Sequence, residues 1–449
     1  MNKNAIDLTL EEIRAALEAE QFDIAIQAFH RLRPADRAEA FADLGDKMQQ
    51  VLLPELDIET TADLLEELED MAAADVAGNL TTERLADVLD EMEPDDAADV
   101  LGDLTPERAA EALAEMEDAE EVIPLLEHED ETAGGLMTTS FITLSPDNTA
   151  GQAVQILRRI KPDTEIPYYL YVVDTDYRLI GIVGLRELVI ASPADIIRRI
   201  MDPEVVYVTT AMDQEDAANV MARYDLAALP VLNEEGRLQG VITHDDLYNV
   251  LEEEATEDIY RLANVADGDL TIHSPISLEV RRRLPWLFLN TLTALFAAWV
   301  ISHYETLIAQ VAILAVFQSV VAGMGGNAGT QSLAMVVRAI ALGDIPPNKA
   351  YRTVLKEGGT GIIQGVCVGI SVGLGVYLWK GNLFLGLVLC LALIGNMFIA
   401  VIVGTIVPLV LKAVKQDPAL ASSVLVTAVT DSVGFFLFLS LATLFQGHL

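Results

Sequence analysis

Several kinds of residue are scarce in this chain of 449 residues, and each scarcity excludes a class of protein. There are two cysteines, Cys367 and Cys390, and both lie in hydrophobic runs, so neither a disulfide framework nor a thiolate metal site is indicated. The six histidines are scattered without the spacing of metal ligands. No nucleophile, base or phosphate-binding loop is arranged in a recognisable way, and we therefore expect no enzyme activity.

Basic residues are also scarce, and the shortage is confined to one part of the chain. Residues 1–284 hold 21 Lys and Arg against 64 Asp and Glu, a formal net charge of −43, whereas residues 285–449 have a net charge of +2. A surface so acidic repels phosphate, which excludes nucleic acid as a partner, and its natural counter-ions are metal cations. A solvated acidic surface without bound metal would explain the charge equally well.

A secretory signal is missing from the first residues, MNKNAIDLTLEEIRAALEAE, because they have no apolar core behind a basic region. We expect the N-terminal half to be cytosolic.

Long apolar runs are present only after Arg283. Hydropathy predicts five membrane spans, about 285–304, 307–341, 358–379, 383–411 and 419–445, each at least as long as the roughly 20 residues that a bilayer needs. Lys and Arg precede the first span and lie between the second and third and between the fourth and fifth, whereas the other two connections have almost none. The positive-inside rule therefore places the N-terminus inside and the C-terminus outside the membrane.

The acidic half contains two internal repeats, of which the first has a period of 12 residues. Helix-start signals occur at Thr81-Thr82-Glu83, Pro94-Asp95-Asp96 and Thr105-Pro106-Glu107. The pattern predicts short helices stacked as a superhelical array, for which a plain scaffold is the simplest role. One apolar series that carries the period consists of Leu64, Val76, Val88, Val100 and Ala112.

The second repeat has a period of 59 residues. The segment YLYVVDTDYRLIGIVGLREL (169–188) matches ALPVLNEEGRLQGVITHDDL (228–247), with Arg178 over Arg237 and Gly181 over Gly240. Each copy indicates an apolar strand, an acidic turn, a second apolar strand and the start of a helix. The two copies resemble a pair of CBS domains, which usually regulate rather than catalyse.

The resemblance to CBS domains also implies a nucleotide site. In that family a Thr-x-x-Asp at the start of the last helix often holds a nucleotide ribose. Thr243 and Asp246 match this motif, whereas the first copy has Gly184 and Glu187 in its place. Binding of an adenine nucleotide such as ATP is therefore implied at Thr243 and Asp246.

One carboxylate interrupts the last predicted span. Asp431 is the one charged residue between Ala419 and Phe445. An ionisable side chain at the centre of a span costs roughly 2.5–3.5 kcal/mol on insertion scales, so it requires a partner or a water-filled cavity. Asp431 therefore predicts a cation site, although a hydrogen bond with Thr427, Thr430 or Ser432 would also satisfy it.

The second predicted span contains the string GMGGNAGTQS, residues 323–332. Its glycines allow helices to approach closely and leave backbone carbonyls able to face a pore. A helix contact would explain the glycines alone. It would not explain the neutral oxygens of Asn327, Thr330 and Gln331 in the same segment, which suit a hydrated hard cation.

The whole arrangement resembles the MgtE family of magnesium channels. The resemblance rests on the order of the predicted parts and on GGNAGTQS, LEEEATEDIYRL (251–262), DPALASSVLVTAVTDSVGFFLFLSLA (417–442) and AGGLMT (133–138). It implies a multi-domain fold with an acidic, α-helical, superhelical N domain (1–132), tandem α/β CBS domains (133–200 and 201–262), a connecting or plug helix (263–284) and an all-α membrane domain of five transmembrane helices (285–449).

The resemblance implies a magnesium pore in a homodimer. The protein would lie among the lipids of the plasma (inner) membrane of a prokaryote, with the pore on the two-fold axis and Asp431 from each subunit around one hydrated Mg²⁺, near the Ala428 carbonyl. A wide site with few carboxylates suits Mg²⁺, which releases its water reluctantly. The residues implied to line the pore are Gly325, Gly326, Asn327, Thr330 and Gln331.

The resemblance further implies that cytosolic Mg²⁺ closes the pore by bridging the helical array, the CBS pair and the connecting helices. Asn249 stands where the family can have an aspartate, which predicts one weaker ligand set. Solvated helix surfaces would explain any single one of these acids. The implied gating ligands are Asp95, Asp99, Asp213, Glu215, Ala222 (through its carbonyl), Asp225, Asp246, Glu254, Glu257, Asp258 and Asp417.

Three other functions fit parts of the sequence. A sodium-coupled magnesium exchanger with the same membrane fold stays open, and single-channel current without a sodium gradient would decide. A CBS-regulated chloride channel is disfavoured, because Asp431 without an intramembrane cation is wrong for anions. A magnesium sensor that uses its spans as an anchor would not need polar groups in two of them.

Overall fold

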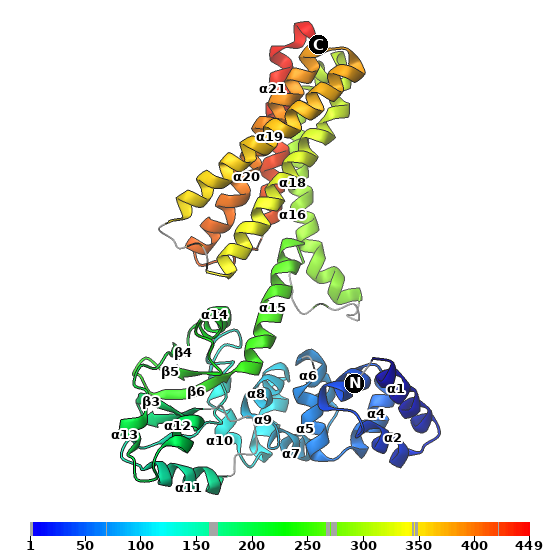
Figure 1. The fold of residues 1–449 in the computed structure, drawn as a ribbon. Coiled ribbons are helices and arrows are strands. Elements are labelled where there is room, and N and C mark those ends of the chain that lie inside the picture. Colours follow the sequence, from blue (N-terminus) through cyan, green and yellow to red (C-terminus); the bar gives the residue numbers. More distant parts are fainter. Residues whose placement is uncertain are drawn as a thin grey trace. The chain divides into compact units, whose positions relative to one another are not determined.

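The computed structural model describes residues 3–68, 70–160, 169–265, 270, 276–343, 345, 349–420 and 422–449. These residues form two compact units, Met1–Val250 and Leu251–Leu449 (Figure 1). The finer domain bounds predicted from the sequence stay predictions.

The first unit begins with an array of short helices that follow one another along the chain (Figure 1). The predicted helix starts are confirmed: the Thr81 side chain caps α7 by accepting from the Arg84 N–H, and Pro94 and Pro106 are the first residues of α8 and α9. The elements are α1 (Lys3–Glu18), α2 (Phe22–Phe29), α3 (Pro34–Ala42), α4 (Asp46–Leu52), η1 (Leu53–Glu55), α5 (Ile58–Glu66), α6 (Asp70–Gly78), α7 (Thr82–Leu89), α8 (Pro94–Asp103), α9 (Pro106–Glu115), α10 (Ala119–Val122) and η2 (Leu125–Glu127).

The apolar series with the 12-residue period forms the core of this array, since all five of its members are buried. One hydrophobic cluster continues from the array into the second CBS sheet, through residues such as Leu101, Val122, Met221 and Ile242. This shared core packs α8 against the second CBS copy within the same unit.

The 59-residue repeat folds as two three-stranded sheets. Each sheet pairs a short first strand in parallel with the second and the second antiparallel with the third. The first copy contains β1 (Thr143–Leu144), α11 (Ala150–Ile160), β2 (Tyr169–Val173), β3 (Leu179–Gly184), α12 (Leu185–Ile190) and α13 (Ile197–Ile200). The second contains β4 (Val208–Thr209), α14 (Gln214–Tyr224), β5 (Ala228–Leu232), β6 (Leu238–Thr243) and α15 (His244–Leu262).

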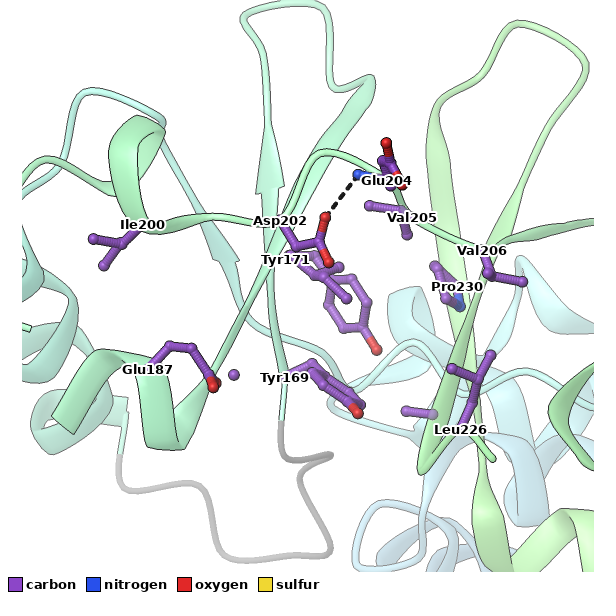
Figure 2. Close-up of a pocket in the computed structure, with 13 residues that line it drawn as sticks. Tyr169, Tyr171, Glu187, Ile200, Asp202, Glu204, Val205, Val206, Leu226 and Pro230 are labelled. Atoms are coloured by element: carbon purple, nitrogen blue, oxygen red, sulfur yellow. Dashed lines mark hydrogen bonds between the residues drawn. The ribbon is translucent and has the colours of Figure 1, made fainter. Parts of the chain in front are cut away.

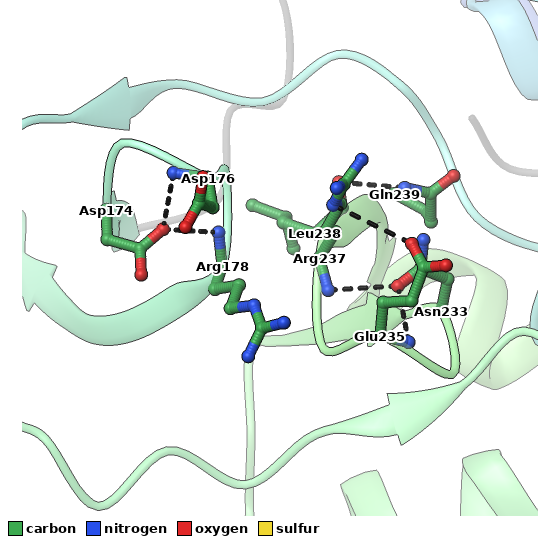
Figure 3. Close-up of polar contacts among 8 residues, drawn as sticks. All are labelled: Asp174, Asp176, Arg178, Asn233, Glu235, Arg237, Leu238 and Gln239. Atoms are coloured by element: carbon green, nitrogen blue, oxygen red, sulfur yellow. Dashed lines mark hydrogen bonds and ion pairs between the residues drawn. The ribbon is translucent and has the colours of Figure 1, made fainter.

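Equivalent residues of the two copies meet at the predicted acidic turns (Figure 3). Arg178 and Arg237 lie opposite each other as an antiparallel pair, and the Leu179 N–H donates to the Gly236 carbonyl (3.3 Å). Both turns use the same side-chain bond: the Arg178 N–H donates to Asp174 and the Arg237 N–H donates to Asn233, each over 3.0 Å. The repeat seen in the sequence is therefore a pseudo-two-fold pair in the structure.

The second unit consists of the end of α15 and long helices. They are α16 (Ile276–Ser302), α17 (Glu305–Gln310), α18 (Ile313–Ala341), α19 (Ala350–Lys380), α20 (Leu383–Ala413) and α21 (Ser422–Leu444), followed by η4 (Gln446–His448). Among the described residues, four helices are long and apolar enough to cross a membrane, namely α16, α19, α20 and α21. The helix α18 is 29 residues long but contains the polar string 323–332, which lowers its mean hydropathy.

Two predicted boundaries in this unit differ from the structure. The span 307–341 is not one helix, because the chain breaks at Val311 and Ala312 between α17 and α18. The division between 284 and 285 falls inside α16, which continues through Pro285. Most of the predicted plug helix before Ile276 lies outside the described residues.

Glycines set the spacing of the central helices. Gly365, Gly369 and Gly373 of α19 face α20, and a Cβ atom built on Gly373 would lie 2.6 Å from the Gly386 carbonyl oxygen. Such contacts let the two helices run side by side for their whole length (Figure 1).

Candidate functional site

Asp431 lies half-buried on α21 without a protein partner. No hydrogen bond or ion pair reaches its carboxylate within the part of the chain that the structure describes. The Thr427 hydroxyl donates to the Ser423 carbonyl (2.9 Å) and the Thr430 hydroxyl to the Thr427 carbonyl (3.1 Å), while Ser432 Oγ is buried with no partner. The side-chain hydrogen bond that would have satisfied Asp431 locally is thus not observed.

The helix α18 has two different faces. Gly325, Ala328, Gly329 and Ser332 are buried, and Gly326 is half-buried. The polar residues of the same string, however, are exposed in this single chain: Asn327, Thr330 and Gln331. An exposed amide and hydroxyl stripe on a membrane helix requires water or protein rather than lipid.

The buried face of α18 meets α21 beside Asp431. A Cβ atom built on Gly329 would lie 2.5 Å from Val426 Cγ1 and 3.6 Å from Thr430 Cγ2, so only glycine allows this approach. Thr430 precedes Asp431 in α21, so the glycine string contacts α21 within one residue of the intramembrane carboxylate.

Asn396 is a residue of this contact that the sequence interpretation missed. It is fully buried on α20, and its Nδ2 donates to the Val321 carbonyl on α18 (2.9 Å), while its Oδ1 has no partner within the described part of the chain. Cβ atoms built on Gly325 of α18 and Gly434 of α21 would lie 2.2 and 2.6 Å from Asn396 Nδ2. The asparagine therefore sits between the two helices, and its only sequence signal is a lone amide in the apolar run LALIGNMFIAV.

The predicted gating acids Glu254, Glu257 and Asp258 of α15 lie close to Asp417, which precedes α21 in the chain. The sequence interpretation missed their cation: Arg261 of α15 forms ion pairs with Glu257 and with Asp417. Burial raises the pKa of Asp258 to about 6, and the negative charges of Asp417 and Glu254 add to the shift. A metal ion bound here would have to share these carboxylates with Arg261.

A second group of acids lies at the contact of α8 with the second CBS copy. Burial, together with the negative charges of Asp246 and Glu93, raises the pKa of Asp95 well above its ordinary value. Burial raises the pKa of Asp96 to about 10 and that of Glu93 to about 7, with repulsion from Glu66 and Asp246 contributing to both. Asp95 is buried, and its Oδ1 has no hydrogen-bond partner among the described residues. The structure thus brings the predicted Asp95 and Asp246 together and adds three acids that were not predicted, Glu66, Glu93 and Asp96.

Other predicted gating residues lie apart from this group or already have a structural role. Asp99 is exposed and close enough to raise the pKa of Asp96. The Asp213 carboxylate caps α14 by accepting from the Glu215 N–H (3.0 Å). Ala222 and Asp225 are exposed at the end of α14, where Asp225 has a left-handed φ of 53°.

The acids do not form a finished metal cage. Within the described ranges, no three His, Cys, Asp or Glu side chains are placed to hold one metal ion directly.

A cavity of about 380 Å³ lies between the two CBS copies (Figure 2). β2 presents Tyr169 and Tyr171 to it on one face, and the buried Tyr171 hydroxyl has no hydrogen-bond partner among the residues that the structure describes. Glu187 and Asp202 also line the cavity, and Asp202 accepts from the Glu204 N–H (2.9 Å). The cavity therefore offers aromatic rings, carboxylates and an unsatisfied hydroxyl to a ligand.

The predicted nucleotide residues Thr243 and Asp246 do not line this cavity. Asp246 accepts from the Thr243 N–H (3.1 Å) and from its hydroxyl (2.8 Å), so the two residues cap the start of α15. The cavity instead lies at Gly184 and Glu187, the corresponding positions of the first copy.

Family models match most of the chain. A model described as a divalent cation transporter, MgtE, matches residues 318–441, the MgtE intracellular N domain matches residues 32–131, and CBS domains match residues 133–194 and 197–253. The magnesium transporter MgtE of Thermus thermophilus is 39% identical over 326 residues, which are 72% of each chain. The protein of the same name from Enterococcus faecalis is 35% identical over 74% of this chain and 73% of its own.

Solved structures agree with these relatives. The soluble part of a magnesium transporter is 30% identical with a TM-score of 0.50, covering 56% of this chain and 99% of its own. The cytosolic domain of the Mg²⁺ channel MgtE in complex with ATP is 34% identical with a TM-score of 0.51, covering 54% of this chain and 99% of its own. On these matches, the chain belongs to the MgtE family.

Proposed function

We propose that this protein transports Mg²⁺ across a membrane and that Asp431 binds the ion on its way. The observation that carries the proposal is Asp431 itself, a half-buried carboxylate on a membrane helix for which the described residues supply no cation or hydrogen-bond donor. The polar stripe is on α18, whose buried face contacts α21 at Gly329 and Thr430, and it offers neutral oxygens that suit the water shell of the ion. The names of the relatives support Mg²⁺ as the transported cation.

The transporting form is a homodimer in the plasma membrane of a prokaryote, with its N-terminus in the cytosol and its C-terminus outside. The stripe of Asn327, Thr330 and Gln331 supports the dimer, because it is exposed in one chain and needs a second protein surface or water to cover it. Two copies of Asp431 on a shared axis would favour a divalent over a monovalent cation. Ala428 and the glycines 325 and 326 would complete the pore lining.

Cytosolic Mg²⁺ closes the pore by binding the two groups of acids. Burial and neighbouring carboxylates raise the pKa values of Glu93, Asp96 and Asp258 in these groups, and a divalent cation bound there would neutralise the crowded carboxylates. One helix, α15, carries Asp246 in its first turn and Arg261 in its last, so it connects the cytosolic acids to the pore helices. The remaining predicted ligands also belong to this proposal: Asp99, Asp213, Glu215, Ala222 and Asp225.

An adenine nucleotide binds in the cavity between the CBS copies. Tyr169 and Tyr171 can stack on or bond to a base, and Glu187 or Asp202 can accept from ribose hydroxyls. The ATP-bound cytosolic domain among the similar structures supports this ligand class.

Uptake of Mg²⁺ into liposomes tests the pore assignment. Asp431→Ala should reduce the flux at least tenfold while the protein still inserts, because removal of an intramembrane charge makes insertion easier. Glu305→Ala is the matched control, since it removes an exposed acid from the same unit and should keep the wild-type flux. Wild-type flux in Asp431→Ala would refute the assignment, and a strict need for a sodium gradient would indicate a coupled exchanger instead of a channel.

A further inference from the structure

The Asn396 carboxamide of α20 lies between two glycines of neighbouring helices. A Cβ atom built on Gly325 of α18 would lie 2.2–3.2 Å from Cγ, Oδ1 and Nδ2 of Asn396. One built on Gly434 of α21 would lie 2.6–2.9 Å from the same three atoms. The carboxamide therefore fills the space that both glycines leave, and its size sets the separation of α18 and α21 at this level. We call the Asn396 carboxamide between Gly325 and Gly434 the spacer.

A hydrogen bond orients the spacer. Asn396 Nδ2 donates to the Val321 carbonyl (2.9 Å), one turn before Gly325 on α18. Asn396 is fully buried in a membrane helix, where burial of an amide is costly unless it is hydrogen-bonded. An apolar side chain could fill this space without that cost, but no bond would hold it at one place on α18. The bond therefore fixes the spacer to α18 as well as filling the gap.

On α21 the spacer acts close to Asp431. The helices α18 and α21 touch directly at Gly329 and Thr430, and Thr430 precedes Asp431. Gly434, which meets the spacer, follows Asp431 within one turn. The intramembrane carboxylate thus lies between two points at which α21 is held against its neighbours.

The same two points enclose part of the polar stripe on α18. Gly325 meets the spacer and Gly329 meets α21, and Asn327 lies between these two glycines in the sequence. Two contacts along a pair of rigid helices fix both their separation and their relative tilt. A change in the size of the spacer would therefore move Asp431 relative to the stripe while the direct contact at Gly329 acts as the pivot.

We propose that Asn396 is a positioning residue for Mg²⁺ transport, because its carboxamide sets how far Asp431 lies from the polar stripe of α18. Asn396 acts through the two helices, since it is fully buried on α20. A group that binds an ion must be held in place by the residues behind it, and the spacer has this role here. The effect on transport rests on the proposed function of Asp431, whereas the spacer contact itself does not.

A double-mutant cycle on the full-length protein in detergent tests the spacer contact without measuring transport. Gly434→Ala should lower the unfolding temperature, because the new methyl group collides with the carboxamide. In the Asn396→Ala background the same methyl group enters the space that the carboxamide has left, so Gly434→Ala should there be neutral or stabilising. An equal loss in both backgrounds, or failure of both proteins to fold, would overturn the contact.

Uptake of Mg²⁺ into liposomes tests the positioning role. Asn396→Ala and Asn396→Leu change the size of the spacer and remove its hydrogen bond, so each should raise the Mg²⁺ concentration of half-maximal flux by roughly fivefold or more. A merely structural role would lower the maximal flux, because less protein is folded, and would leave the half-maximal concentration unchanged. Gly434→Ala should bring the half-maximal concentration of Asn396→Ala back toward that of the wild type.

Ile394→Ala is the matched control, because Ile394 lies on α20 but faces α19. A Cβ atom built on Gly369 of α19 would lie 3.3 Å from Ile394 Cγ1. This variant should lower stability through a cavity and leave the half-maximal concentration unchanged. The same rise in Ile394→Ala, or no rise in either Asn396 variant while Asp431→Ala loses its flux, would overturn the positioning role and leave the proposed function standing. Wild-type flux in Asp431→Ala would overturn the proposed function and the role given to the position of Asp431, but not the spacer contact measured by unfolding.

Discussion

Gly404 shows at the scale of one residue how closely the membrane helices approach. A Cβ atom there would lie 2.3 Å from the Gly329 carbonyl oxygen and 3.3 Å from the Leu333 nitrogen, both backbone atoms that cannot rotate away. Gly404→Ala should therefore destabilise the protein by about 1–3 kcal/mol, the usual cost of overpacking. Gly375→Ala is the matched control, because a Cβ on that membrane glycine meets nothing within 4 Å. Thermal unfolding in detergent measures the stability of both variants. Equal shifts of the unfolding temperature in the two variants would contradict the close backbone contact at Gly404.

Glu93 gives a prediction on pH. Its pKa is raised from 4.5 to about 7, first by burial and then by Glu66, Asp245 and Asp246. The folded state therefore holds the proton more tightly than the unfolded state, so the stability from this group is full below pH 4.5 and is lost as the pH rises through about 7. In a chelator, the unfolding temperature of the wild type should fall over this range more steeply than that of Glu93→Gln. Parallel curves would show that Glu93 is solvated in the folded protein.

Single residues differ in how far the sequence could predict them. Asp431 could be proposed as a cation site from the sequence because it is isolated in an apolar run, and that role stays a prediction. The burial of Glu357 on α19 was not predictable, because the predicted third span begins at 358 and assigns this acid to a polar connection, whereas α19 begins at Ala350. Asn396 has no charge, and its importance depends on which helices flank α20, which periodicity cannot give.

At the scale of elements, local sequence signals predicted where a helix begins better than where a helical segment is interrupted. Thr81, Pro94 and Pro106 start helices where expected, since capping and proline geometry act within one turn. The break at Val311 and Ala312 has no such signal, because both residues are apolar and suit a helix interior. Pro285 is the converse case: the predicted domain division falls directly before it, whereas the helix α16 continues through it.

The helical array also depends on arginines that the apolar period does not reveal. Arg84, in the first turn of α7, donates to the carbonyls of Pro54 (3.0 Å), Leu53 (3.2 Å) and Leu56 (2.5 Å). Arg108, 24 residues later in α9, donates to the Leu80 carbonyl (2.5 Å) and to the Thr82 hydroxyl (2.6 Å). Each guanidinium thus ties its helix to the end of an earlier one.

Arg84→Ala should destabilise the array by about 2–4 kcal/mol, because it leaves three backbone carbonyls, including the part-buried carbonyl of Leu53, without their charged donor. Arg84→Lys should recover only part of this loss, since one ammonium cannot reach three carbonyls in the geometry of the guanidinium fork. Arg33→Ala removes an exposed arginine of the same array and should change the unfolding temperature little. Full rescue by lysine would contradict the conclusion that the Arg84 guanidinium holds three carbonyls at once.

At the scale of the whole molecule, the sequence gives the amount of negative charge, and the structure shows which of the acids are buried together. Residues 1–284 carry a net charge of −43, yet the acids with the largest pKa shifts are few and lie at one contact between α8 and the second CBS copy. The sequence could give the excess of charge and the candidates Asp95 and Asp246. It could not separate them from the many solvated acids, because that distinction depends on burial at a contact between distant segments.

This distinction leads to a prediction for the full-length protein. If the buried acids bind Mg²⁺, cleavage by a protease that cuts after glutamate should slow as Mg²⁺ rises through about 0.1–1 mM, the range of weaker carboxylate sites. Salt also relieves repulsion in so acidic a protein, so the informative quantity is the protection by Mg²⁺ beyond that by NaCl at equal ionic strength.

Asp95→Asn with Asp246→Asn should abolish this excess, because it removes two carboxylates of the α8 contact. Asp7→Asn with Glu11→Gln changes the net charge equally on the exposed surface of α1 and should retain the excess. Protection by NaCl equal to that by Mg²⁺ in the wild type, or the same loss in both variants, would mean that the acids act only as a solvated surface and that Mg²⁺ closes the pore elsewhere.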